Sequence, residues 1–151
     1  MKPLLLTALG RTISTAPLGR RGDDIEVRRI PTLPTARTID LDRPTVIVLD
    51  RALLASTAGD AERVRDLAAL VAVVGIGEAG ESEPGEDFPV DLLSGYVAGD
   101  AAVGGVIAAL RGAFRHAAAL VSARHARGDA EDRARELADL TAIGGIGRAH
   151  V

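Results

Sequence analysis

Hydrophobic residues along the chain gather into short runs, which polar, glycine-rich or proline-containing stretches separate. Four of these runs have the length and apolar content of β-strands, at residues 3–9, 44–49, 71–76 and 95–98. A fifth stretch, residues 25–30 (IEVRRI), alternates apolar and polar residues before Pro31 and predicts an edge strand. The runs at residues 44–49 (PTVIVL) and 71–76 (VAVVGI) are apolar at nearly every position, which is typical of strands covered on both faces of a sheet. Residues 60–70 repeat apolar side chains every three or four positions and predict an amphipathic helix.

The order of these elements predicts the fold class. Strands that alternate with helical or looped connections indicate a mostly parallel sheet with right-handed crossovers. Five such strands are the number found in a flavodoxin-like, doubly wound α/β domain. After the last strand, the chain from residue 100 onward is rich in alanine and contains no proline. It predicts one long C-terminal helix that continues to about Ile143.

The charge pattern divides this long helix in two. Between Val103 and Val121, apolar residues recur every three or four positions, so this part is expected to pack on the sheet. Beyond Ser122 the composition becomes strongly charged. We therefore expect a domain at residues 1–121 and a separate helical segment at residues 122–151.

Apolar residues return on one face of the charged segment at Leu137, Leu140 and Ile143. An isolated charged helix of this length is only marginally stable in water unless it is paired. The stripe therefore predicts a parallel two-stranded coiled coil and a homodimer, in which charged neighbours set the register. A solvated or frayed tail is the alternative.

Composition and charge narrow the classes of function. The 47% hydrophobic content is enough for a core, but there are only three aromatic residues, and the formal net charge is -3. Binding to nucleic acid is therefore not expected. The absence of cysteine excludes disulfides and thiolate metal sites. No contiguous apolar run approaches the roughly 20 residues of a membrane span, so we expect a cytoplasmic protein without a membrane partner.

Gly75, Gly77 and Gly80 spell the G-x-G-x-x-G pattern of a dinucleotide-binding loop. Such a loop must open a helix whose N-terminus faces the pyrophosphate. Here the glycines lead into ESEPGEDFP, whose prolines break helices and whose carboxylates repel phosphate. The pattern therefore favours a simple exit from a buried strand. We expect the acidic loop of residues 78–89 to be mobile and to bind no nucleotide.

Three stretches, TVIVLD, VAVVGIGEA and SGYVAGD, resemble in order and spacing the third, fourth and fifth strands of bacterial response-regulator receiver domains. In that family the third strand ends in the aspartate that accepts a phosphoryl group, and Asp50 stands at that place. Tyr96 matches the family's switch aromatic. The resemblance covers roughly residues 3–121 and implies the same fold as the hydrophobic pattern.

The sequence lacks three groups that help phosphoryl transfer in this family. The hydroxyl residue at the end of the fourth strand falls at Gly75, or at Gly77 if the alignment is shifted. The lysine after the fifth strand falls at Gly99, and the acidic pair that holds magnesium falls at Ala8 and Leu9. Phosphoryl transfer to an aspartate needs a metal ion and donors around the transferred group.

The resemblance therefore implies a degenerate receiver, or pseudo-receiver, that is not phosphorylated. Asp50 is then expected to be an ordinary aspartate at a strand end, which caps the next turn. No metal ion or cofactor is expected. Two alternatives stay open: a true phosphoacceptor receiver that uses Asp50, and a small-ligand or nucleotide-binding domain at Gly75–Gly80.

The remaining residues offer little further chemistry. His116 and His125 are nine positions apart, which is not the spacing of a metal-binding pair on a helix, and no serine lies in a nucleophile motif. Nothing in the sequence predicts an enzyme. The stretch RELADLTAIGGIGRA looks like the connector that precedes GAF domains in bacterial signalling proteins. The expected role is a regulatory and dimerisation module of a two-component signal-transduction protein, which would pass its signal to an output domain in a longer chain.

Overall fold

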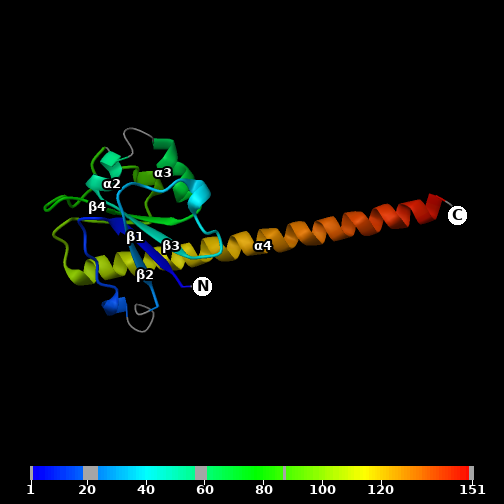
Figure 1. Ribbon diagram of the computed structural model, residues 1–151, viewed down its shortest axis with the longest axis horizontal. Helices are drawn as coiled ribbons and strands as arrows, with labels where there is room; N and C mark the ends of the chain where they lie inside the picture. The colour runs from blue at the N-terminus through cyan, green and yellow to red at the C-terminus, as the bar shows by residue number, and fades with distance from the viewer. Residues whose placement is uncertain (1, 19–23, 57–60, 87, 150–151) are drawn as a thin grey trace. The chain divides into compact units, whose positions relative to one another are not determined.

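The computed structural model describes residues 2–18, 24–56, 61–86 and 88–149, with Ala16 and residues 141–149 described by their backbone alone. Within these ranges, five strands form a parallel sheet in the order β2-β1-β3-β4-β5 (Figure 1). The strands are β1 (Leu4–Ala8), β2 (Glu26–Ile30), β3 (Thr45–Leu49), β4 (Ala72–Ile76) and β5 (Gly95–Val97). This is the strand order of flavodoxin-like domains, so the predicted doubly wound α/β fold is confirmed.

One face of the sheet is covered by the crossovers that lead from β2 to β3, from β3 to β4 and from β4 to β5. These crossovers contain η2 (Ala36–Thr38), α2 (Arg51–Ser56), α3 (Ala61–Ala68) and η3 (Val90–Leu92). All three run in the same direction across the sheet, so right-handed connections place them on one face. Leu6, Ile47 and Val73 of the strands pack there with Leu53 and Leu67 of the helices.

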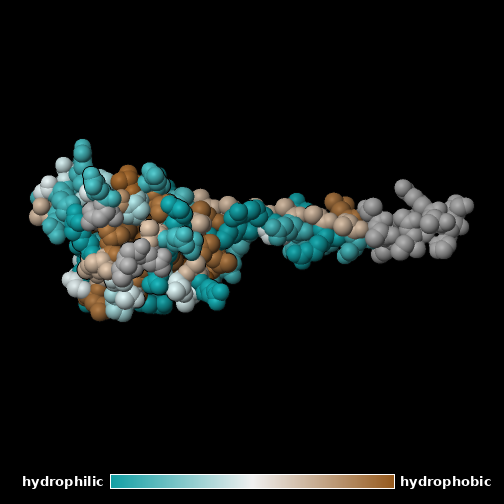
Figure 2. All heavy atoms as spheres, turned by 90° about the horizontal axis from the view of Figure 1, so that it is seen from above, coloured by the Kyte–Doolittle hydropathy of each residue, from teal (hydrophilic) through white to brown (hydrophobic). Residues whose placement is uncertain are grey.

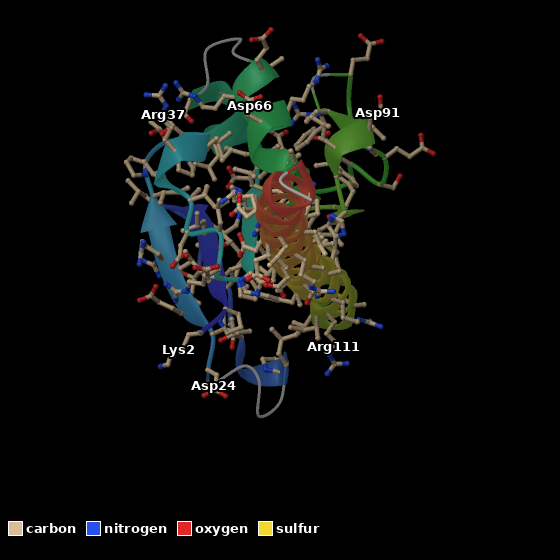
Figure 3. All side chains as sticks on the ribbon, turned by 90° about the vertical axis from the view of Figure 1, so that its right-hand side faces the viewer. Lys2, Asp24, Arg37, Asp66, Asp91 and Arg111 are labelled. Atoms are coloured by element: carbon tan, nitrogen blue, oxygen red, sulfur yellow. The ribbon has the colours of Figure 1, made fainter. Side chains whose placement is uncertain are left out.

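The opposite face is covered by the first part of α4 (Val103–Ala149) and by the connection from β1 to β2. This connection runs across the sheet in the other direction, so a right-handed crossover places it on the α4 face. In its described part it contains only one short helical turn, η1 (Ala16–Leu18). Figure 3 shows Asp66 of α3 and Arg111 of α4 on opposite sides of the sheet.

The core on the α4 face joins the helix to the central strands. Leu110 is 1% exposed and lies in the same buried cluster as Leu5, Val46 and Val74. Alanines on α4 let the helix approach the sheet closely, since Ala113 is fully buried between these larger side chains.

The structure differs from the sequence-based expectations in two helices. The sequence analysis predicts no helix at α2, because six residues are too few to show a helical repeat. The predicted helix at residues 60–70 is present as α3, and residue 60, the first of the predicted range, lies outside the described residues. Val103, expected to begin the buried stripe of α4, is 68% exposed, and the buried positions begin at Ile107.

The chain divides into two compact units, Met1–Val121 and Ser122–Val151. The second unit is helical to Ala149, and its described side chains from His125 to Leu140 are all exposed. Figure 2 shows this segment as mostly hydrophilic, with a hydrophobic patch just before the grey residues. The large apolar side chains there are Leu137 and Leu140, each 64% exposed. The side chain of Ile143, the third residue of the predicted stripe, lies outside the described residues.

By length and composition alone, α4 is apolar enough over Val103–Leu140 to cross a membrane. The sequence contains no contiguous apolar run of membrane-spanning length here, because charged residues interrupt the apolar residues of α4. Ile107, Leu110 and Val121 are buried, as in the core helix of an α/β domain. Packing on the sheet thus accounts for these three residues, while 28% of the apolar window as a whole is buried.

Candidate functional site at the carboxyl end of the sheet

The residues singled out from the sequence meet at one edge of the sheet. In a parallel sheet all strands end at the same edge, and open α/β sheets bind their ligands there. Asp50 directly follows β3, Gly75 lies in β4, Tyr96 lies in β5 and Gly99 follows β5. Arg11, which follows β1, is brought to the same edge.

Asp50 is only 6% exposed, and hydrogen bonds engage both of its carboxylate oxygens. The backbone N–H of Leu53 donates to Oδ1 at 2.9 Å. Asp50 precedes α2 by one residue, so this bond makes it the N-cap of that helix. The Arg11 Nε donates to Oδ2 at 3.0 Å. Asp50 thus has the capping role expected of an aspartate at a strand end, together with a cation that the sequence analysis did not find.

Arg11 stands just after the strand whose end carries the magnesium-binding acids in receiver domains. The Arg11 guanidinium places its positive charge directly beside the Asp50 carboxylate. A buried carboxylate without a partner is costly, since the charge has lost its water. The Asp50 side chain is 8% exposed and that of Arg11 is 31% exposed, so the pair is partly shielded from solvent. The charge of Asp50 is balanced within the protein.

Sequence spacing could not reveal this pair, because the two residues are 39 positions apart. The usable signal is the strand order. β1 and β3 are neighbours in the sheet, so the residues that follow them meet at one edge. Opposite charges after two neighbouring strands are then candidates for an ion pair.

Tyr96 covers the places where a receiver carries its hydroxyl residue. A Cβ atom added at Gly77 would lie 1.9 Å from the Tyr96 Oη. One added at Gly75 would lie 2.9 Å from the Leu93 Cδ1 and 3.0 Å from the Tyr96 Cδ2. No side chain fits at Gly77 while the tyrosine ring keeps its place, and one at Gly75 would require Leu93 and the ring to shift. The Tyr96 Oη donates a hydrogen bond to the backbone oxygen of Glu81 at 3.0 Å, which holds the ring there.

Gly99, at the place of the receiver lysine, is pressed against the backbone that follows β4. A Cβ atom at this position would lie 2.6 Å from the Gly77 carbonyl oxygen. The Gly99 N–H also donates to the Glu78 carbonyl at 3.1 Å. The close approach of the two chain segments therefore requires glycine, and it leaves no room for a lysine stem.

The acidic loop after β4 is held to the domain by a second ion pair. Arg51 binds Glu81 with two hydrogen bonds, Nε to Oε1 at 3.0 Å and Nη2 to Oε2 at 2.6 Å. The bond from Arg51, and then the bond from the Glu78 N–H, hold the pKa of Glu81 below its ordinary value. The Arg51 guanidinium also lies 5.4 Å from the ring centroid of Phe88, which packs edge-to-face on Tyr96 at 5.6 Å.

The last glycine of the G-x-G-x-x-G pattern completes a turn. Gly80 has a φ of 83°, a conformation that favours glycine, and its N–H donates to Asp100 Oδ1 at 2.9 Å. No helix begins between residues 77 and 86, so the pattern presents no helix N-terminus to a phosphate. The bonds to Glu81 and Gly80 tie down the start of a loop that the sequence analysis expects to be mobile.

The described residues contain no group of three or more histidine, aspartate or glutamate side chains that could hold a metal ion. At the sheet edge the carboxylates are instead occupied by arginines and backbone N–H groups. This arrangement can hold loops in place.

No protein-family model and no curated protein sequence matches this chain. A solved structure described as a trimeric coiled coil of yeast Spc42 (amino acids 181–211) fused to another structure is similar over 91% of this chain and 94% of its own, at 16% sequence identity. The TM-score of 0.44 is too low for this similarity to carry an argument about fold, assembly or function.

Proposed function

We propose that this chain is a non-catalytic regulatory module, a degenerate receiver-like domain of a cytoplasmic signalling protein in which Asp50 does not accept a phosphoryl group. The observation that carries the proposal is the engagement of Asp50, which is 6% exposed, caps α2 and is paired with Arg11 at 3.0 Å.

The chemistry of phosphoryl transfer supports this proposal. The attacking carboxylate needs an oxygen that the phosphodonor can reach, and the transferred group needs a metal ion and donors for its equatorial oxygens. Here Arg11 bonds one oxygen of Asp50 and the Leu53 N–H bonds the other. Gly77 and Gly99 leave no room for the hydroxyl and ammonium groups that assist the transfer in receiver domains.

We predict that incubation with acetyl phosphate and magnesium leaves the chain unmodified. Intact-protein mass spectrometry would measure this, with an active receiver domain treated in parallel as the positive control. Asp50→Asn serves as the matched variant, and its spectrum should be as unchanged as that of the wild type. A phosphoryl adduct that is present in the wild type and absent in Asp50→Asn would show that Asp50 is a working phosphoacceptor.

We further propose that the module acts as a homodimer, paired through the helical segment that begins at Ser122. Leu137 and Leu140 lie three positions apart on one helix face, and each is 64% exposed. Burial of each such side chain is worth roughly 1.5–3 kcal/mol, which favours pairing of two copies. Charged residues flank the stripe and would set its register: Glu131, Asp132, Arg133, Arg135 and Glu136. Signals would then pass along α4 to an output domain.

We expect the full chain to sediment as a dimer at concentrations of tens of micromolar. Burial of two large apolar side chains per copy is expected to give a dissociation constant on the order of micromolar. The double variant Leu137→Ser with Leu140→Ser should be monomeric, because it removes the apolar stripe and keeps the helix charges. Ala138→Ser, exposed on the same segment, is the matched control and should remain dimeric. Sedimentation equilibrium decides the question. Monomers for all proteins, or a dimer that survives the double variant, would contradict pairing through this stripe.

A further inference from the structure

A cavity of about 380 Å³ lies at the end of the sheet opposite to Asp50. Pro3 and Pro44, which precede β1 and β3, line it, whereas Asp50 follows β3. The cavity lies on the α4 face, beside the connection from β1 to β2. A doubly wound domain ordinarily covers this region with a crossover helix, and the described part of this connection supplies only η1.

The walls of the cavity are largely apolar. Leu18, Ile25 and Phe114 line it, and each is only partly buried although it packs against the core. The volume falls within the range of small-molecule sites, which are mostly apolar with a few polar groups that fix the orientation of the ligand. The cavity is thus large enough for the apolar body of a small ligand.

Two arginines of α4 supply the charged groups of this cavity. Arg111 and Arg115 are one helical turn apart, and both line it (Arg111 is labelled in Figure 3). Arg111 Nη2 donates to the Pro17 carbonyl at 3.3 Å, and Arg115 Nε donates to the Arg111 carbonyl at 3.4 Å. Neither arginine takes part in the ion pairs of the described residues. A guanidinium has five N–H donors, so both retain donors for a ligand.

We infer that this cavity binds a small amphipathic carboxylate, with its apolar body against Phe114 and its carboxylate held by Arg111 and Arg115. Planar guanidinium groups bind carboxylates through paired, charge-assisted hydrogen bonds. Asp24 also lines the cavity, so the described lining residues, with two arginines and one aspartate, carry one net positive charge. That balance suits a monoanion better than a doubly charged phosphate. The site requires nothing of Asp50, so it stands independently of the proposed signalling role.

Octanoate is a suitable probe, because it has an eight-carbon body and one carboxylate. Isothermal titration of the full chain with octanoate should give a dissociation constant on the order of 0.1–1 mM, as expected for a ligand of this size. Octan-1-ol lacks the charge and acetate lacks the apolar body. Both should bind at least about tenfold more weakly, since each loses one half of the recognition.

Variants separate the two halves of the proposed site. Arg111→Gln with Arg115→Gln should weaken octanoate binding by about tenfold or more, because two charge-assisted contacts are lost. Ala118→Trp, which adds bulk to the lining, should weaken it while both arginines remain. Arg127→Gln removes a charge from α4 outside the cavity and should bind like the wild type. Denaturant midpoints from circular dichroism would check that each variant is folded.

Three results would overturn this inference. They are the absence of octanoate binding to the folded wild type at millimolar concentration, equal binding of octan-1-ol, and unchanged binding by the folded double arginine variant. None of these results bears on whether Asp50 is phosphorylated. Failure of the ligand site and failure of the proposed function are therefore distinguishable.

Discussion

Replacement of Leu110 with alanine is expected to destabilise the fold of the first unit by about 2–5 kcal/mol. Leu110 lies on α4, is 1% exposed and belongs to the same buried cluster as Val46, Val48 and Val74 of the central strands. Truncation to alanine loses the transfer free energy of three carbon atoms and leaves a cavity that a close-packed sheet face cannot collapse to fill. The size of the effect measures how firmly the first part of α4 belongs to the core.

Urea titration followed by tyrosine fluorescence would measure this effect. Tyr96 is the only tyrosine of the chain, which has no tryptophan, so the signal reports on the first unit. Val103→Ala is the matched control, since Val103 is on the same helix and 68% exposed, and it should change the stability by no more than about 0.5 kcal/mol. Equal effects of the two variants would contradict the packing of α4 on the sheet.

Gly77→Ala should destabilise the domain by about 1–3 kcal/mol or more, because the new Cβ would lie 1.9 Å from the Tyr96 Oη. The tyrosine ring cannot move away without breaking its hydrogen bond to the Glu81 carbonyl and its edge-to-face contact with Phe88. Tyr96→Phe removes the oxygen and leaves the Cζ atom, which would be 2.9 Å away. The double variant should therefore be less destabilised than the sum of the two single variants, by roughly 1 kcal/mol.

Circular dichroism in urea would measure this cycle, because Tyr96→Phe removes the fluorescent group. Gly112→Ala is the control, since a Cβ there meets nothing within 4 Å and alanine favours the helix, so a gain of about 0.5–1 kcal/mol is expected. If Gly77→Ala were as harmless as Gly112→Ala, or if the two effects at positions 77 and 96 simply added, Tyr96 would not be what excludes a side chain at position 77.

The sequence predicts the sheet well because its strands are short and separated by clear breaks, and the three central ones, β1, β3 and β4, are buried along their whole length. The pattern at residues 44–49 matches β3 (Thr45–Leu49), which is buried along its whole length. The same rule cannot find α2, whose six residues include one fully buried side chain, Leu53. Its start is set by Asp50, which caps the helix through a bond that only the folded chain reveals.

The candidate site was predictable in position but not in its contacts. Strand-end residues such as Asp50 and Gly99 fall at the sheet edge once the strand order is known. The ion pairs Arg11–Asp50 and Arg51–Glu81 join residues that are 39 and 30 positions apart. From the sequence alone, several other arginines and acidic residues were equally plausible partners in such pairs. The need for glycine at position 77 follows from the orientation of the Tyr96 ring, which no local pattern encodes.

The packing of Tyr96 over Gly77 also constrains how the chain could change over evolutionary time. A serine or threonine at position 77 brings the same Cβ as alanine and meets the same clash with the Tyr96 Oη. A lysine at position 99 meets the Gly77 carbonyl, whose place depends on the same turn. A larger residue at either position would thus need compensating changes in Tyr96 or in the turn that follows β4. Glycine is therefore expected to persist at positions 77 and 99 unless several neighbouring residues change together.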